Sequence, residues 1–119
     1  MILVDTSVWI DHLRSGVHSL QELLNNQEVL THPFVIGELS LGTLRNRDEI
    51  LSLLSKLPAA PLAEHEEVMS IVSAHRLSGT GIGWIDAHLL ASALLGNAKI
   101  LTRDKQLQKA TILLGVAPS

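Results

Sequence analysis

The sequence contains no cysteine and no tyrosine, and only three of its 119 residues are Phe or Trp. The absence of cysteine excludes a disulfide framework and a thiolate metal site, and it is typical of proteins in a reducing cytoplasm. Because aromatic residues are so scarce, we expect a core of aliphatic side chains, supplied largely by the 23 leucines. An apolar content of 46% also argues against an intrinsically disordered chain.

Long hydrophobic runs and a basic leader are missing as well. No window holds the 18 or so uncharged apolar residues that a membrane-spanning helix requires. Met1 leads directly into Ile2, Leu3 and Val4, without the basic segment that opens a secretory signal peptide. We therefore expect a cytoplasmic protein with no membrane segment and no signal peptide.

Positive charge is in short supply. Nine Lys and Arg residues face twelve Asp and Glu residues, which gives a net charge of −3 at pH 7. Proteins that bind nucleic acid through a broad surface usually carry a positive surplus, so this balance argues against such a surface. The positions of the acids are more informative than their number.

Short apolar runs alternate with helical periodicity, and the length suits one domain, residues 1–119. We expect strands at residues 2–4, 29–31 and 99–102, with weaker candidates at 62–63 and 112–113. Helical spacing bounded by Gly and Pro predicts helices at 6–15, 19–26, 33–44, 48–57, 64–76, 84–95 and 104–109. Strands separated by helices form βαβ units, so we predict the α/β class, with a parallel sheet covered on both faces.

Four of the twelve acids occupy unusual positions. Asp5 and Asp104 follow two of the expected strands, and open α/β sheets bind ligands beyond the carboxyl ends of their strands. Glu38 and Asp86 are single charges on otherwise apolar helices, where a charge is costly unless it is paired or bound to a metal. Each residue also has a structural explanation, as a helix N-cap, a first-turn acid or a rim residue. Taken one at a time, both interpretations stay open.

Taken together, these four acids indicate a metal site if the elements that carry them converge. Two like charges about 4 Å apart repel by roughly 4 kcal/mol at an effective dielectric constant of about 20. Four ionised carboxylates therefore need cations or protons to stay close. Oxygen ligands without cysteine favour Mg²⁺ or Mn²⁺. Such a cluster suits metal-assisted hydrolysis of a phosphodiester.

Four segments in this order resemble the PIN domain, and more closely the VapC-type ribonuclease toxins of prokaryotic toxin–antitoxin modules. The segments are Val4-Asp5-Thr6-Ser7-Val8-Trp9, Glu38 within its apolar helix, Asp86-Ala87-His88-Leu89-Leu90-Ala91, and Leu101-Thr102-Arg103-Asp104. The resemblance covers essentially the whole chain. It implies a short five-stranded parallel sheet of order 3-2-1-4-5, whose switch point lies between the strands that end at Asp5 and Thr102.

The resemblance also implies an activity, a cofactor and partners. It implies cleavage of RNA with Mg²⁺ or Mn²⁺, by a protein that forms a homodimer and is held by a cognate antitoxin. The implied catalytic and metal-binding quartet is Asp5, Glu38, Asp86 and Asp104. Thr6 and Thr102 match polar positions that support the quartet, and Thr102 would orient a carboxylate. Many members carry an aromatic residue soon after the last Asp, where this chain has Leu107.

Two pairs of basic residues are candidates for contact with RNA phosphates. Arg45 and Arg47 lie just beyond the helix of Glu38, and Arg103 and Lys105 flank Asp104. A solvated helix surface is the alternative for both pairs. Without the proposed quartet, eight acids face nine bases, so the rest of the chain carries a charge of +1. The charge balance therefore does not exclude an acidic crevice that cuts RNA.

Two other functions are consistent with parts of the sequence. A phosphoaspartyl phosphatase also places an Asp after its first strand, but it needs a second Asp two residues later, where this chain has Ser7. A PIN-like module that binds RNA or protein without cutting is the non-enzymatic alternative. Degenerate modules usually lose acids, whereas all four positions are acidic here.

Overall fold

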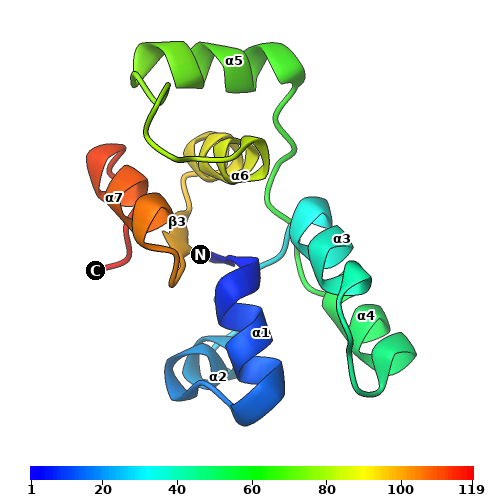
Figure 1. The fold of residues 1–119 in the computed structure, drawn as a ribbon. Coiled ribbons are helices and arrows are strands. Elements are labelled where there is room, and N and C mark those ends of the chain that lie inside the picture. The colour runs from blue at the N-terminus through cyan, green and yellow to red at the C-terminus, as the bar shows by residue number, and fades with distance from the viewer.

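Ten secondary-structure elements make up the chain, and the computed structural model describes all residues, 1–119 (Figure 1). In chain order they are β1 (Ile2–Val4), α1 (Thr6–Ser15), α2 (His18–Asn25), β2 (Val29–Leu30), α3 (Pro33–Leu41), α4 (Arg47–Ser55), α5 (His65–Ala74), α6 (Trp84–Leu95), β3 (Lys99–Leu101) and α7 (Lys105–Leu113).

The sheet is parallel, and β1 lies at its centre. This strand pairs with β2 on one side and with β3 on the other, so the strand order is β2-β1-β3. The register aligns Ile2 with Val29 and with Lys99. Leu3 and Val4 are fully buried, as expected for a central parallel strand that is covered on both faces. The predicted α/β class is confirmed.

The expectation of five strands is wrong, because the sheet has three. The candidate at residues 62–63 is irregular chain, and the pairing beyond β2 consists of a single parallel bridge between Thr31 and Ala59. In that bridge, Thr31 N–H donates to the Pro58 carbonyl at 2.8 Å and Ala60 N–H donates to the Thr31 carbonyl at 2.9 Å. Proline has no N–H to offer a strand neighbour, so a proline-rich segment does not extend the pairing.

The other weak candidate, residues 112–113, forms the end of α7. Ile112 and Leu113 are exposed there, whereas Leu107 and Ala110 are buried at helical spacing. Two adjacent apolar residues have no period of their own, and the helical pattern of their neighbours decides their structure.

Beyond β3, the neighbouring segment again makes only a minimal contact. Ile100 N–H donates to the Val116 carbonyl at 2.8 Å, and Lys99 Nζ donates to the Gly115 carbonyl at 3.0 Å. Irregular chain therefore contacts each edge of the three-stranded sheet at one position.

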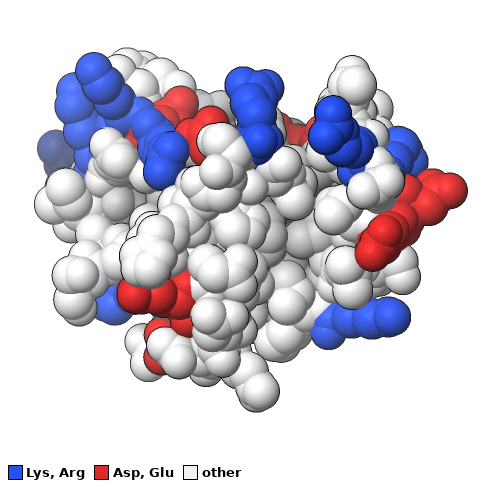
Figure 2. Space-filling model, turned by 90° about the horizontal axis from the view of Figure 1, so that it is seen from below, with Lys and Arg blue, Asp and Glu red and all other residues white.

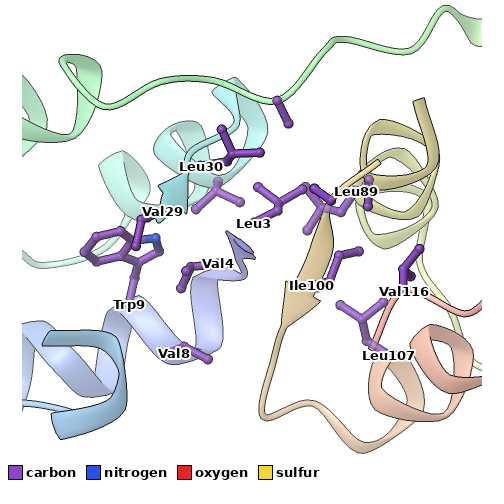
Figure 3. Close-up of a cluster of buried hydrophobic side chains, with 14 of the residues drawn as sticks. Leu3, Val4, Val8, Trp9, Val29, Leu30, Leu89, Ile100, Leu107 and Val116 are labelled. Atoms are coloured by element: carbon purple, nitrogen blue, oxygen red, sulfur yellow. The ribbon is translucent and has the colours of Figure 1, made fainter. Parts of the chain in front are cut away.

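The helices form layers around the sheet. In Figure 1, α5 and α6 lie on one side of it and α1 and α2 on the other, while α3 and α4 lie beyond β2 and α7 lies beside β3. Successive residues of a strand point to opposite faces. Figure 3 accordingly shows Leu3 on the side of Leu89, and Val4 on the side of Val8 and Trp9. The core is aliphatic apart from Trp9, as the composition predicts.

The backbone, rather than the apolar pattern of the sequence, sets the bounds of α3 and α4. The helix expected to reach residue 44 ends at Leu41, because Gly42 is fully extended, with φ −87° and ψ 178°. The following helix is displaced toward the N-terminus and spans Arg47–Ser55, after Asn46 in the left-handed region. These differences leave Glu38 within α3, as expected.

Helix α6 is the central helix of the core. Seven consecutive residues of it, from 87 to 93, are buried. It is also the longest helix, with 12 residues, and none of the helices has the length and hydropathy needed to cross a bilayer.

A fully buried histidine links α3 to α6. His32 caps α3, because its Nδ1 accepts the Phe34 N–H at 3.0 Å. Nδ1 therefore carries no proton, and the proton on Nε2 is donated to Ser92 Oγ at 3.1 Å. Burial, with a smaller contribution from His88, lowers the pKa of His32 to about 4. The folded protein thus keeps this ring neutral well below its ordinary titration range.

We predict that His32→Asn flattens the pH dependence of stability. Between pH 6.5 and about 4, the unfolded chain binds a proton at His32 that the folded chain does not, so the wild type loses stability as the pH falls. From pH 7 to 4.5 the wild type should lose about 2–3 kcal/mol more than H32N, as measured by urea unfolding. His18, which is exposed, provides the control: H18N should keep the wild-type slope. Equal slopes for the wild type and H32N would contradict the assignment.

Candidate active site

The carboxyl ends of β1 and β3 bring Asp5 and Thr102 into contact. Because these strands are parallel neighbours, the residues that follow them emerge at the same edge of the sheet. Both side chains are only 5% exposed. Thr102 Oγ1 donates a hydrogen bond to Asp5 Oδ2 at 2.8 Å. The threonine hydroxyl therefore holds this carboxylate in place.

Ser7 also holds Asp5, although the sequence alone did not mark it as a site residue. Its hydroxyl donates to Asp5 Oδ2 at 2.9 Å and accepts from the Arg103 N–H at 3.0 Å. Thr102 Oγ1 in turn accepts from the Asp104 N–H at 3.1 Å. These bonds join the start of α1 to the turn between β3 and α7. The only sequence signal for Ser7 is its place two residues after Asp5.

Asp104 caps α7 and faces the carboxylate cluster as well. Its Oδ1 accepts the Leu107 N–H at 2.9 Å, which is the N-cap bond that the sequence allowed. Its negative charge also raises the pKa of Asp86. The structural and the functional interpretations of Asp104 are therefore compatible.

Asp86, in the first turn of α6, is the acid whose pKa departs most from its ordinary value. Burial raises its pKa to about 6, and the charges of Asp5, Asp104 and, least, Glu38 add to the rise. The backbone hydrogen bond to Gly83 lowers the pKa, as a helix N-terminus does, but it is outweighed. Asp5, Asp104 and Glu38 are thus near enough to Asp86 for their charges to raise its pKa.

Glu38 lies at the edge of this cluster. Thr6 Oγ1 donates to Glu38 Oε1 at 2.8 Å and so ties α3 to the first residue of α1. Glu38 also lines a groove of about 540 Å³ between α1 and the segment from α3 to the start of α4. Thr6 therefore orients Glu38 at the boundary between the cluster and the groove.

The basic residues next to Asp104 lie on the surface. The side chain of Arg103 pairs with Asp11, with 2.6 Å between Nη1 and Oδ2. Lys105 is the exposed first residue of α7. The Arg103 backbone contributes to the network around Asp5, while its side chain fastens the same turn to α1.

The second basic pair follows α3. Arg45 lines the groove together with Glu38, and Arg47 Nη2 donates to the Ser40 carbonyl at 2.7 Å. Figure 2 shows Lys and Arg side chains spaced along one edge of the molecule, with acidic side chains between them. Contact of these residues with RNA stays a prediction.

The donor atoms of the cluster fit a hard divalent cation. Both hydroxyls that reach Asp5 bond to Oδ2, and no protein donor bonds to Oδ1. Burial and, to a smaller extent, the charges of Asp5, Asp104 and Glu38 raise the pKa of Asp86, and no basic side chain lowers it. No three His, Asp or Glu side chains are close enough to form a complete ligand set. Carboxylate oxygens are the ligands that Mg²⁺ and Mn²⁺ prefer.

A parallel α/β domain with carboxylates at the carboxyl ends of its neighbouring strands defines the class of this protein. Residues 2–113 match the PIN domain, and the chain belongs to this family. The resemblance to VapC-type ribonucleases is also confirmed. The chain is 51% identical over 118 residues to "Ribonuclease VapC32" in each of two strains of Mycobacterium tuberculosis. The matched segment covers 98% of this chain and 95% of that relative.

We predict that Asp86→Asn stabilises the metal-free protein at pH 7.5. When folding raises the pKa of an acid, the folded state loses stability as the pH rises from about 4 to about 6. This loss stays constant at higher pH. Removing the charge should add roughly 2 kcal/mol at pH 7.5 and nothing near pH 3.5 in urea unfolding. D48N, which removes an exposed acid from α4, should bring no comparable gain. A D86N variant that is no more stable than the wild type at pH 7.5 would contradict the description of the cluster.

Ser7→Ala should loosen the turn between β3 and α7. The substitution removes one donor to Asp5 and leaves the Arg103 N–H without its acceptor, so we expect a loss of about 1–2 kcal/mol. Amide hydrogen exchange at Arg103 should become faster, and exchange in α5 should not. S15A provides the control, because Ser15 lies on the same helix and bonds only to a backbone carbonyl. Unchanged exchange at Arg103 in S7A would argue against the role of this hydroxyl.

Proposed function

We propose that this protein is a Mg²⁺- or Mn²⁺-dependent endoribonuclease and the toxin of a toxin–antitoxin pair. The observation that supports the proposal is the environment of Asp86, whose pKa is raised to about 6 by burial and, to a smaller extent, by the charges of Asp5, Asp104 and Glu38. Identity of 51% to a protein named ribonuclease supports RNA as the substrate. The cytoplasm is the compartment that fits the absence of cysteine.

In this proposal, Asp5, Asp86 and Asp104 hold the metal, and Glu38 holds a bound water or a second metal. A bound Mg²⁺ or Mn²⁺ would supply an activated water and would offset negative charge on the phosphate. Thr102 and Ser7 fix Asp5 with Oδ1 turned away from their hydroxyls. Thr6 fixes Glu38 in the same way. The hydroxyl groups would therefore set the positions of Asp5 and Glu38 before any ligand binds.

The alternatives are less well supported. Ser7 donates its proton to Asp5, so its position offers no general acid for a phosphatase that forms a phosphoaspartate. A PIN-like module that binds without cutting has no need for a buried Asp5 and a half-buried Asp86 whose charges repel each other. The cost of holding them together is better explained by a cation that they bind.

Partners follow from the family resemblance. We propose RNA as the substrate, a cognate antitoxin as the inhibitor and a homodimer as the working form. Arg45, Arg47, Arg103 and Lys105 are the proposed phosphate contacts, and all four are exposed. Such contacts add affinity and position the backbone without selecting a sequence.

RNA cleavage with Mg²⁺ or Mn²⁺ is the direct test. The D5N/D86N variant should lower the rate roughly a thousandfold, and EDTA should abolish cleavage, because both remove the means of stabilising charge on the phosphate. The E22Q/E28Q variant removes the same charge from exposed positions and should cleave like the wild type.

The toxin role has a separate readout in the same variants. Induced expression of the wild type should arrest bacterial growth, whereas D5N/D86N should not. Cleavage that persists in EDTA or in D5N/D86N would overturn the metal mechanism, and growth unaffected by an active enzyme would overturn the toxin role.

A further inference from the structure

Only one Lys or Arg side chain of this protein is paired with an Asp or Glu side chain. The chain has nine Lys and Arg residues and twelve Asp and Glu residues, yet Arg103 and Asp11 form the single pair, with 2.6 Å between Nη1 and Oδ2. Both side chains are about half exposed, and exposed ion pairs usually contribute little to stability. The place of this pair in the fold is therefore more informative than its strength.

The pair joins two segments that carry the candidate site. Asp11 lies in α1, the helix that begins directly after Asp5. Arg103 lies in the turn between β3 and α7, 92 residues further along the chain. In Figure 1 this turn lies next to α1.

Arg103 is attached to α1 at two points. Its backbone N–H donates to Ser7 Oγ at 3.0 Å, and its guanidinium group donates to Asp11. Ser7 and Asp11 are four residues apart, so they lie on the same face of α1, one helical turn from each other. A single contact would let the turn pivot about Ser7, whereas two contacts fix its direction along the helix. Asp11 provides the second contact.

Both neighbours of Arg103 belong to the site. Thr102 Oγ1 donates to Asp5 Oδ2 at 2.8 Å, and Asp104 is one of the proposed metal ligands. The peptide bonds on either side of Arg103 are planar and stiff, so a displacement of this residue is passed to both neighbours. The placement of Arg103 therefore affects two of the proposed carboxylates.

The turn is also joined firmly to α7. Gln108 Nε2 donates to the Thr102 carbonyl at 2.9 Å, and Asp104 Oδ1 accepts the Leu107 N–H at 2.9 Å. The turn and the first turns of α7 thus form one unit. The contacts with Ser7 and Asp11 attach this unit to α1.

We propose that Asp11 is a positioning residue of the nuclease. Through Arg103 it would fix the turn between β3 and α7, and with it the placement of Asp104 relative to Asp5. The proposal rests on the ribonuclease function proposed above and adds a residue to which that function gives no role. Asp11 bonds only to Nη1, and no protein acceptor bonds to Nη2 or Nε, so Arg103 keeps N–H groups for a phosphate.

Competition with the substrate is the other role that Asp11 could have. In that case Asp11 would neutralise Arg103 and weaken its contact with a phosphate, so removal of Asp11 would lower KM and leave kcat unchanged. Positioning predicts the opposite result, a lower kcat with an unchanged KM. The backbone bond from Arg103 to Ser7 favours positioning, because the ion pair continues an attachment that already reaches Asp5.

Steady-state cleavage of a short single-stranded RNA at saturating Mg²⁺ distinguishes the two roles. Asp11→Asn should lower kcat about fivefold, the most that an exposed ion pair usually contributes, and should leave KM within about twofold. R103A should lower kcat to a similar extent and also raise KM, because it removes a proposed phosphate contact. In D11N/R103A, kcat should be no lower than in R103A, because the pair is already broken. E22Q, which removes an exposed acid from α2, should behave like the wild type.

Reversal of the pair provides a rescue experiment. D11K/R103E places opposite charges at the same two positions, so kcat should return to within about twofold of the wild type while KM stays raised. D11K alone places two positive charges side by side and should lower kcat below that of D11N. A D11K/R103E variant with a kcat no higher than that of D11K would overturn the proposal.

Amide hydrogen exchange in the metal-free protein gives a readout that does not depend on cleavage. D11N should speed exchange at Arg103 and Asp104, whose N–H groups bond to Ser7 and Thr102, and should leave exchange in α5 unchanged. A uniform increase over the whole chain would mean that D11N only destabilises the fold, and the proposal would fail.

The outcomes separate this proposal from the proposed function. If the wild type cleaves RNA and D11N lowers KM without changing kcat, Asp11 competes with the substrate; the positioning role is wrong and the nuclease stands. The same holds if the effects of D11N and R103A on kcat multiply in the double variant. If the wild type does not cleave RNA at all, the proposed function fails, and a positioning role in that reaction fails with it.

Discussion

Two hydroxyl groups meet on one carboxylate oxygen, and the site depends on that contact. Ser7 and Thr102 both donate to Asp5 Oδ2, from segments that are 95 residues apart in the chain. In doing so they join β1, the start of α1 and the turn that leads into α7. Backbone N–H groups of Arg103 and Asp104 complete the same network. The carboxylate is therefore fixed by hydroxyl donors rather than by an opposite charge, and no protein donor bonds to its second oxygen.

The negative charge of the cluster explains why neutral hydrogen-bond donors, rather than basic side chains, hold Asp5. The cluster lacks a basic partner, since Arg103 is paired with Asp11 and Arg47 is bonded to a backbone carbonyl. Neutral donors can hold an acid without cancelling its charge, whereas an arginine would hold it and also compete with a cation. Figure 2 shows basic side chains along one edge of the molecule, with acidic side chains between them.

The features that are local in sequence could be predicted from it. The strand Ile2–Val4, the apolar helix α6 and the four isolated acids each have a pattern that is complete within a few residues. The outer strands could not be predicted, because two apolar residues fit a strand or a helix equally well, and their neighbours settle the matter only in three dimensions. Ser7 was missed for a related reason: its role depends on Arg103, which comes close only after β1 and β3 have paired.

The minimal pairing at the two sides of the sheet has a consequence for assembly. An exposed strand edge is a template on which another chain can add a strand. Here the segment around Ala59 pairs with the chain at Thr31, just beyond β2, and the segment around Val116 accepts the Ile100 N–H of β3, so each occupies part of an edge. Neither segment offers a regular ladder of its own. A strand added at either edge would therefore have to displace one of these segments before a regular ladder could form.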